Sequence, residues 1–159
     1  MTILSDKSIV QLVENNDITI DPFVDKNLTP NGYDLTIEEI EIPEKQKTAT
    51  KKMTIPPGER FAVSTKEVIS CGENHCAQLW LRTSWARKGI ICSFGKIDSG
   101  FKGNLTLLGL NTSKKNIDLE IGNTFAQIVF EKLSTTANEL YEKRSGNYQN
   151  QKGITWSKE

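Results

Sequence analysis

Two of the four arginines in the chain lie close together, in the segment Arg82-Thr83-Ser84-Trp85-Ala86-Arg87. A guanidinium group binds phosphate oxygens in a planar two-point contact that lysine cannot reproduce, and neighbouring hydroxyl groups add donors. If Thr83 and Ser84 begin a short helical turn that ends at Gly89, the backbone N–H groups of that turn face the same anion. The segment therefore predicts a phosphate-binding site. Its alternative interpretation is a pair of surface arginines that flank a packed Trp85.

A second group of residues, Cys71, His75 and Cys76, has side chains that could bind a metal. Structural zinc sites use four ligands in paired spacings, and His75 is the only histidine in the chain. The group therefore favours free thiols, with the cysteines acting as small buried apolar residues. The three cysteines are an odd number, and no export signal is recognisable at residues 1–6, so a cytoplasmic location is expected.

The elements that must position these residues are mainly short strands. Ser5 can cap a helix that runs to about Asn15, because Ile9, Leu12 and Val13 recur at helical spacing. After this helix, apolar and polar residues alternate in short runs that are separated by frequent turn signals. The runs include residues 18–20, 77–81 and 105–110, and the turns include Pro30-Asn31-Gly32, Pro56-Pro57-Gly58, Ser99-Gly100 and Gly122-Asn123. This pattern predicts an all-β barrel or sandwich with a short N-terminal helix.

Composition limits the classes of function. The 159 residues suggest one domain, and 20 basic against 20 acidic residues give a net charge of zero, so no nucleic-acid partner is expected. The longest run without a charged residue spans 11 positions, 103–113, which is too short to cross a membrane. The lysine-rich residues 44–52 favour a solvated loop.

The chain divides into a barrel domain at residues 1–133 and a C-terminal tail at residues 134–159. The tail is rich in Lys, Asn, Gln and Gly, which is typical of a disordered segment. It also contains Tyr141, Tyr148 and Trp156, and aromatic residues are unusual in a segment that only contacts solvent. A tail that folds over a ligand would account for them.

Several motifs, taken in order along nearly the whole chain, resemble those of the dUTPase and dCTP deaminase superfamily. They are Gly32-Tyr33-Asp34-Leu35, Pro57-Gly58-Glu59, residues 82–89, Ile97-Asp98-Ser99-Gly100-Phe101-Lys102-Gly103, residues 122–130 and Tyr148-Gln149-Asn150-Gln151-Lys152-Gly153. The resemblance implies a homotrimer of distorted jelly-roll β-barrels. It also implies dUTP or a related nucleotide as substrate, bound between subunits with Mg²⁺ on the triphosphate.

The resemblance also assigns roles to individual residues. Asp98 matches the acid that contacts the sugar and, in the hydrolases, orients the attacking water. Asp34 matches an acid that holds the metal through water, although an Asx turn is the structural alternative for both aspartates. Arg87 and Gln127 are the other expected catalytic residues, although Gln127 would otherwise be the polar face of a strand whose Ala126, Ile128 and Phe130 point inward. The expected substrate-binding residues are Arg82, Thr83, Ser84, Phe94, Lys96, Tyr148, Gln151 and Lys152.

One departure from the family pattern bears on the reaction. The deaminating members use a Glu ten residues beyond the Asp, and that position is Leu108 here. Residues 99–117 contain no Asp or Glu, so a shift of register does not supply the missing acid. The zinc-deaminase signature is absent as well. We therefore expect hydrolysis of dUTP to dUMP and pyrophosphate, with Asp98 as general base.

Two alternatives remain open at this point. The first is a dCTP deaminase, or a bifunctional enzyme, that takes its acid from elsewhere. The second is a catalytically silent nucleotide-binding trimer. The tail resembles that of the deaminases, with Asn147 where a Lys usually precedes the Tyr, and the glycine-rich last motif of the trimeric dUTPases is missing. If the chain is viral, the expected location is the cytoplasm of the host cell.

Overall fold

A computed structural model describes residues 2–43, 47–49 and 51–157. Its first regular element after a two-residue strand is helix α1 (Asp6–Glu14), and the side chain of Ser5 accepts a hydrogen bond of 3.4 Å from the backbone N–H of Ser8. This is the N-cap that satisfies an otherwise unpaired donor of the first turn. Ile9 is fully buried, so the apolar stripe faces the core. The predicted helix is confirmed.

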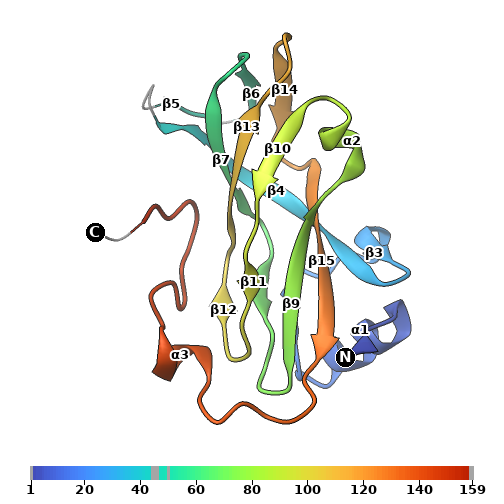
Figure 1. Ribbon diagram of the computed structural model, residues 1–159. Helices are drawn as coiled ribbons and strands as arrows, with labels where there is room; N and C mark the ends of the chain where they lie inside the picture. Colours follow the sequence, from blue (N-terminus) through green and yellow to red (C-terminus); the bar gives the residue numbers. More distant parts are fainter. Residues whose placement is uncertain (1, 44–46, 50, 158–159) are drawn as a thin grey trace.

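The regular structure in the rest of the described chain consists mainly of antiparallel strands (Figure 1). The main sheet has the strand order β10-β13-β7-β4-β15-β9-β11, with β1, β3 and β5 paired at its side, and two small sheets have the orders β12-β8-β2 and β14-β6. Their bounds are β1 (Thr2–Ile3), β2 (Thr19–Asp21), β3 (Leu28–Thr29), β4 (Gly32–Ile42), β5 (Lys47–Thr48), β6 (Lys52–Ile55), β7 (Arg60–Thr65), β8 (Val68–Ser70), β9 (His75–Leu81), β10 (Ile90–Ser93), β11 (Lys96–Ile97), β12 (Lys102–Gly103), β13 (Thr106–Asn111), β14 (Ile117–Glu120) and β15 (Thr124–Lys132). The predicted all-β jelly-roll fold with a short N-terminal helix is confirmed.

Aromatic and branched side chains fill the space inside the curled sheet. Tyr33, Phe61, Phe125 and Phe130 are the largest of the fully buried side chains. Phe61 packs edge-on against Phe125 at 6.0 Å between ring centroids, an arrangement that aromatic rings favour. Gly109 lies directly against the Phe61 ring, where any side chain would overlap it. The core therefore fixes the spacing between β7 and β13.

One expectation about the loops is wrong. Lys47–Thr48 forms β5 against β4, and Lys52 begins β6, so the lysine-rich stretch is not simply a solvated loop. Met53 and Ile55 alternate toward the core from β6, which gives this strand an apolar face to bury. Residues 44–46 and 50 of the predicted loop lie outside the described residues.

The described part of the tail lies along the barrel instead of extending into solvent (Figure 1). It contains the short helix α3 (Tyr141–Arg144), whose first backbone N–H donates to the carbonyl oxygen of Ser99 at 2.9 Å. Farther along, the N–H of Asn150 donates to the carbonyl oxygen of Lys102 at 2.7 Å. Backbone hydrogen bonds of this kind offset the conformational entropy that the polar tail loses when it becomes ordered.

Candidate functional site

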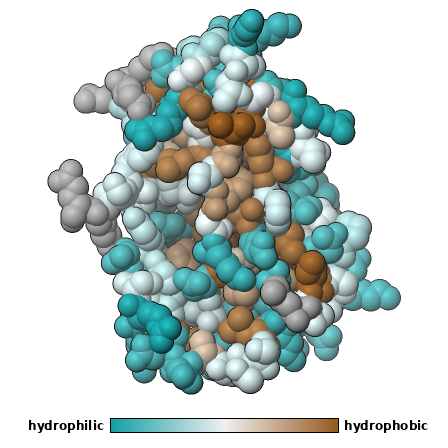
Figure 2. Space-filling model, viewed as in Figure 1, coloured by the Kyte–Doolittle hydropathy of each residue, from teal (hydrophilic) through white to brown (hydrophobic). Residues whose placement is uncertain are grey.

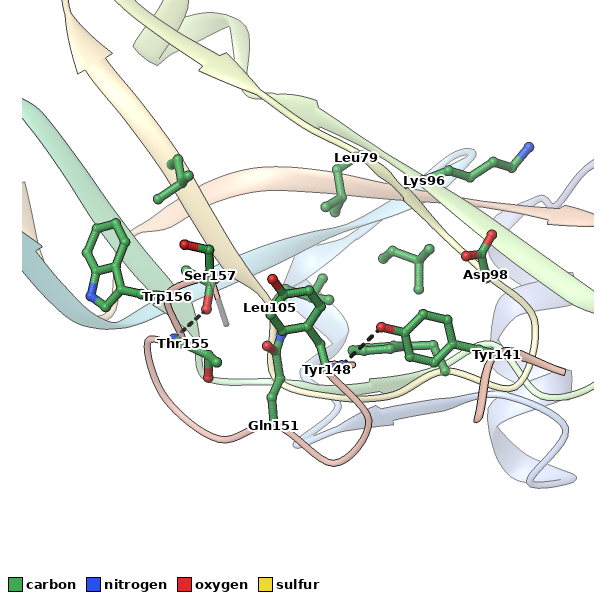
Figure 3. Close-up of a pocket in the computed structure, with 15 residues that line it drawn as sticks. Leu79, Lys96, Asp98, Leu105, Tyr141, Tyr148, Gln151, Thr155, Trp156 and Ser157 are labelled. Atoms are coloured by element: carbon green, nitrogen blue, oxygen red, sulfur yellow. Dashed lines mark hydrogen bonds between the residues drawn. The ribbon is translucent and has the colours of Figure 1, made fainter. Parts of the chain in front are cut away.

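A cavity of about 370 Å³ lies between the barrel and the tail (Figure 3). Its volume is in the range of sites that hold a small molecule. The barrel contributes Leu79, Gly95, Lys96, Ile97, Asp98, Phe101, Leu105, Thr106 and Leu108, and the tail contributes Tyr141, Tyr148, Gln151, Thr155, Trp156 and Ser157. The cavity is therefore mostly apolar, with a small set of polar groups at defined places.

Asp98 is the only carboxylate that lines this cavity in the described part of the chain. It follows β11 directly, and the N–H of Phe101 donates to the carbonyl oxygen of Asp98 at 3.2 Å, which closes a tight turn. Gly100 has a φ of +82° in this turn, a conformation that glycine adopts without strain. Among the described residues, the Asp98 side chain accepts no hydrogen bond, so the turn does not depend on it as an Asx turn would.

Leu108 lines the same cavity as Asp98. It lies on β13 opposite Ala62 of β7 and Ser93 of β10, and it is 38% exposed although it is apolar. The position at which the family resemblance predicts the acid of a deaminase is therefore part of the cavity lining. In this chain the wall is a hydrocarbon surface at that point, which cannot exchange a proton.

Lys96 also lines the cavity, but its ammonium group is held by a partner outside it. Lys96 Nζ lies 3.3 Å from Glu131 Oε2, and Gln78 Nε2 donates to Glu131 Oε1 at 2.7 Å. Figure 3 shows the Lys96 nitrogen at the end of the side chain that points away from Leu105. Glu131 has a 6% exposed side chain, and a buried carboxylate is stable only with such partners.

Glu131 and Gln78 did not emerge from the sequence analysis. Lys96 lies opposite Gln78 in the β11–β9 pairing, and Glu131 lies opposite Cys76 in the β15–β9 pairing. Since Cys76 and Gln78 are two residues apart on one strand, all four side chains share one face of the sheet. In the sequence, the one signal for Glu131 is that it is an acidic residue near the end of the apolar run that becomes β15.

The cysteines do not point toward a common centre. The Cys71 thiol lies 3.9 Å from the carbonyl oxygen of Ile97, whereas the Cys76 thiol lies 3.9 Å from Glu131 Oε2. No group of three or more metal-binding side chains of His, Cys, Asp or Glu occurs in the described ranges. Burial raises the pKa of Cys92 to about 12 and raises the pKa of Cys71 and Cys76 as well, so all three remain protonated thiols near neutral pH.

The arginine segment forms the predicted helical turn. Helix α2 (Thr83–Ala86) follows Arg82, and Gly89 has a φ of +97° just after it. Trp85 is buried, and its indole N–H donates to the carbonyl oxygen of Thr124 at 2.9 Å. Trp85 packs inward while Thr83, Ser84 and Arg87 are exposed, as the alternative interpretation of the segment expects, and phosphate binding stays a prediction.

Arg82 connects this segment to Asp34. Its Nε lies 3.1 Å from Asp34 Oδ2, and its Nη1 donates to Thr124 Oγ1. Burial raises the pKa of Asp34 above its ordinary value, although the charge of Arg82 and the amide of Gln127 act in the opposite direction. Asp34 and Gln127 face each other in the β4–β15 pairing, and Gln127 Nε2 donates to Thr29 Oγ1 at 3.1 Å.

Ala126, Ile128 and Phe130 are fully buried, as expected for an inward face, but Phe125 and Val129 are buried as well, so β15 is covered on both faces. The predicted site residues thus fall into two groups within one chain. Asp34, Arg82 and Gln127 form one group, whereas Lys96, Asp98, Tyr148 and Gln151 line the cavity. Thr83, Ser84, Phe94, Arg87 and Lys152 are not among the residues that line the cavity.

Phe94 instead lines a neighbouring depression that is largely apolar. Trp80 and Ile91 line it as well and are 58% and 56% exposed. Figure 2 shows apolar side chains gathered on this side of the molecule, over β9, β10 and β13. Exposed apolar area of this kind commonly marks a surface for another protein chain.

The tail residues at the cavity are fixed by hydrogen bonds to the barrel and to each other. The N–H of Tyr148 donates to Tyr141 Oη at 3.1 Å, and the Tyr141 ring packs edge-on against Phe101 at 5.5 Å. The N–H of Asn104 donates to the carbonyl oxygen of Gln151 at 3.1 Å. Gly103 has a φ of +155° and lies so close to the Gln151 backbone that a Cβ there would be 3.0 Å from its nitrogen.

Comparison with known proteins places this geometry in context. The family model for dCTP deaminase-like proteins matches residues 37–133. The dCTP deaminase of Pyrococcus horikoshii is 37% identical over 145 residues, which cover 89% of this chain and 91% of the relative. A Sulfolobus islandicus rod-shaped virus 1 protein named "Probable deoxyuridine 5′-triphosphate nucleotidohydrolase" is 33% identical over 160 residues, 99% of each chain.

Among solved structures, the 2′-deoxycytidine 5′-triphosphate deaminase of Agrobacterium tumefaciens matches with a TM-score of 0.69 and 18% identity. The match covers 83% of this chain and 49% of that chain, so the present chain spans about half of the length of that protein. At this identity the likeness concerns the fold. None of the described helices is long and apolar enough to cross a membrane.

Proposed function

The chain belongs to the dCTP deaminase-like family. Within this family, we propose that it is a dUTP diphosphatase, which hydrolyses dUTP to dUMP and pyrophosphate. The relatives carry names for two reactions, deamination of dCTP and hydrolysis of dUTP. The two reactions require different groups in the cavity. Hydrolysis requires one carboxylate near the α-phosphorus, whereas deamination requires an acid that exchanges protons with the pyrimidine ring.

The observation that carries the proposal is that Asp98 and Leu108 line the same cavity. Asp98 can accept a proton from water, but no second carboxylate lines the described cavity to protonate a ring nitrogen. The side chain at the position expected for that acid is Leu108. The viral relative that matches over the full length of this chain carries a dUTPase name, which supports the same reaction.

In the proposed reaction Asp98 orients a water molecule and takes its proton as the water oxygen bonds to the α-phosphorus. The bond between the α-phosphorus and the oxygen that bridges to the β-phosphorus breaks, and pyrophosphate leaves. Negative charge increases on the phosphate oxygens during this step, and positioned cations stabilise it. Arg82 and Arg87, with the hydroxyl groups of Thr83 and Ser84, are the proposed phosphate ligands, and Gln127 is proposed to lie near the attacking water.

These phosphate ligands do not line the cavity of their own chain. We therefore propose a homotrimer in which the arginine segment of one copy faces the Asp98 cavity of the next. The exposed Trp80 and Ile91 provide apolar area for such an interface. Tyr148, Gln151 and Lys152 are proposed to bind the nucleotide from the tail, residues 134–159, and Lys96 and Phe94 from the barrel. Free thiols accord with a cytoplasmic location, or the host cytoplasm for a viral chain.

The Asp34 carboxylate, which is paired with Arg82, is the proposed group for a magnesium ion that arrives with the triphosphate. Mg²⁺ usually keeps several waters and binds through one or two carboxylates together with substrate phosphates. Asp34 supplies one carboxylate with a 12% exposed side chain, and the described residues hold no three-ligand cage. Asp34 would bind a water molecule of the hydrated ion, and the ion would neutralise negative charge on the phosphates. An Asp34→Asn variant should then require a higher Mg²⁺ concentration for half-maximal rate.

One experiment tests the proposed reaction against the alternatives. Purified protein receives dUTP or dCTP separately with Mg²⁺, and pyrophosphate, ammonia and pyrimidine absorbance are followed together. We expect pyrophosphate from dUTP and unchanged cytosine absorbance with dCTP. Ammonia from dCTP would instead support the deaminase, which the names of several relatives favour. Tight binding of dUTP without product over hours would indicate a silent nucleotide-binding protein.

A further inference from the structure

The end of the described tail is fastened to two glutamates of β4. Glu39 Oε2 accepts a hydrogen bond of 2.9 Å from the backbone N–H of Ile154 and one of 3.2 Å from Ser64 Oγ. Glu41 Oε1 accepts a hydrogen bond of 3.1 Å from the indole N–H of Trp156. The two carboxylates are 115 residues away from their tail partners in the sequence. Hydrogen bonds to an ionised acceptor are roughly twice as strong as neutral ones.

Further contacts surround the same segment. The Arg60 guanidinium lies over the Trp156 ring at 5.9 Å from its centroid, a distance at which cation and ring attract. The N–H of Thr155 donates to Thr106 Oγ1 at 2.9 Å. Gly153 has a φ of +59° and lies so close to Glu39 that a Cβ there would be 2.6 Å from Oε2. Residues 153–156 are therefore held by side chains of β4, β7 and β13 together.

This attachment bears directly on the candidate site, because Thr155, Trp156 and Ser157 line the cavity. Figure 3 shows Trp156 and Asp98 at opposite ends of the cavity, with Tyr148 between them. At the other end of the tail, Tyr141 is hydrogen-bonded to Ser99, next to Asp98. The tail thus crosses the cavity as a segment that is attached to the barrel on both sides.

We propose that Glu39 and Glu41 are positioning residues for nucleotide binding. They fasten residues 153–156 to the barrel and so keep Thr155, Trp156 and Ser157 at the cavity that is proposed to hold the nucleotide. The two glutamates do not line the cavity, so they act only through the tail. The proposal rests on the proposed function in one respect, since it takes a deoxyuridine triphosphate as the ligand that the cavity holds.

The expected consequence is on ligand release and not on the chemical step. When a glutamate contact is lost, residues 153–156 are held less firmly and this end of the tail opens more often, although the backbone contacts of Asn150 and Gln151 with the barrel remain. Glu39→Gln and Glu41→Gln should each raise the dissociation rate of the non-hydrolysable α,β-imido-dUTP about tenfold. The KM for dUTP should rise accordingly, while kcat stays unchanged or rises if product release limits turnover.

The strand provides a matched control in Glu38, which is exposed and next to Glu39 in the chain. Glu38→Gln removes the same charge and should dissociate the analogue like wild type. A double-mutant cycle of Glu41→Gln with Trp156→Phe tests the hydrogen bond itself, since the Phe variant removes the indole N–H. We expect the double variant to release the analogue no faster than the more affected single variant.

The outcomes separate this proposal from the proposed function. Dissociation of the analogue requires no turnover, so it can be measured in an inactive protein. A wild type that binds the analogue but does not hydrolyse dUTP refutes the hydrolase, and the dissociation rates of the variants still test the tail attachment. If wild type is active and Glu39→Gln and Glu41→Gln release the analogue like Glu38→Gln, the positioning role is refuted. Additive effects in the cycle, or loss of kcat with unchanged dissociation, refute it as well. A wild type that fails to bind the analogue overturns both proposals.

Discussion

Replacing Asp98 by asparagine is expected to abolish most of the dUTP hydrolysis and to leave nucleotide binding nearly intact. The variant keeps the shape of the side chain but removes the only carboxylate that lines the described cavity. A positioned general base contributes about 10²- to 10⁴-fold to a rate. At about 1.36 kcal/mol for each factor of ten, this is a loss of roughly 2.7 to 5.4 kcal/mol of transition-state stabilisation. Because no other described residue that lines the cavity carries a carboxylate, none of them takes over the role.

The assay measures pyrophosphate release from dUTP together with the affinity for α,β-imido-dUTP. Asp118→Asn is the matched control, because Asp118 is an exposed residue of β14 that is paired with Lys52 at 2.8 Å and does not line the cavity. The control should retain wild-type kcat and KM. A rate within threefold of wild type for Asp98→Asn would refute the assignment of the base. Loss of analogue binding in that variant would show instead that Asp98 mainly holds the substrate.

Three further predictions concern packing and buried charge. Gly109→Ala should lower the free energy of unfolding in urea by roughly 1–3 kcal/mol, because the added methyl group overlaps the Phe61 ring; an unchanged midpoint would contradict this packing. Burial raises the pKa of Glu67, so the folded protein loses stability as pH rises from the ordinary glutamate range through that raised pKa. The Glu67→Gln variant lacks this titration, so the Tm of the variant minus that of wild type should increase as pH rises through the same window; a Tm difference that does not change with pH would contradict this prediction. Lys96→Met should lower Tm because Glu131 loses its ammonium partner at 3.3 Å. Adding Glu131→Gln should recover part of the loss, and no recovery would show that the pair is not coupled.

Local sequence was sufficient for the N-terminal helix, for several strands and for the turn at Asp98. The cap at Ser5, the burial of Ala126, Ile128 and Phe130, and the glycine that ends the helical turn after Arg87 were predicted correctly. Each depends on residues within a few positions of one another, where backbone sterics and the period of a strand or helix decide the outcome. The resemblance of the ordered motifs to one superfamily added the expected reaction and its residues.

The partners of buried and tail residues could not be obtained in this way. The Lys96–Glu131 pair depends on which residues face each other across β11, β9 and β15. The contacts of Glu39 and Glu41 with the tail join positions 115 residues apart.

The sequence by itself determined the all-β class and the N-terminal helix, because these follow from local spacing and residue type, and its resemblance to one superfamily singled out Asp98 and Leu108. Only the tertiary structure decided that Asp98 and Leu108 share a cavity, that the arginine segment lies outside it, and that the tail crosses it. Strand register and the closure of the sheet select these neighbours, and both depend on packing over the whole core and not on any short stretch of chain.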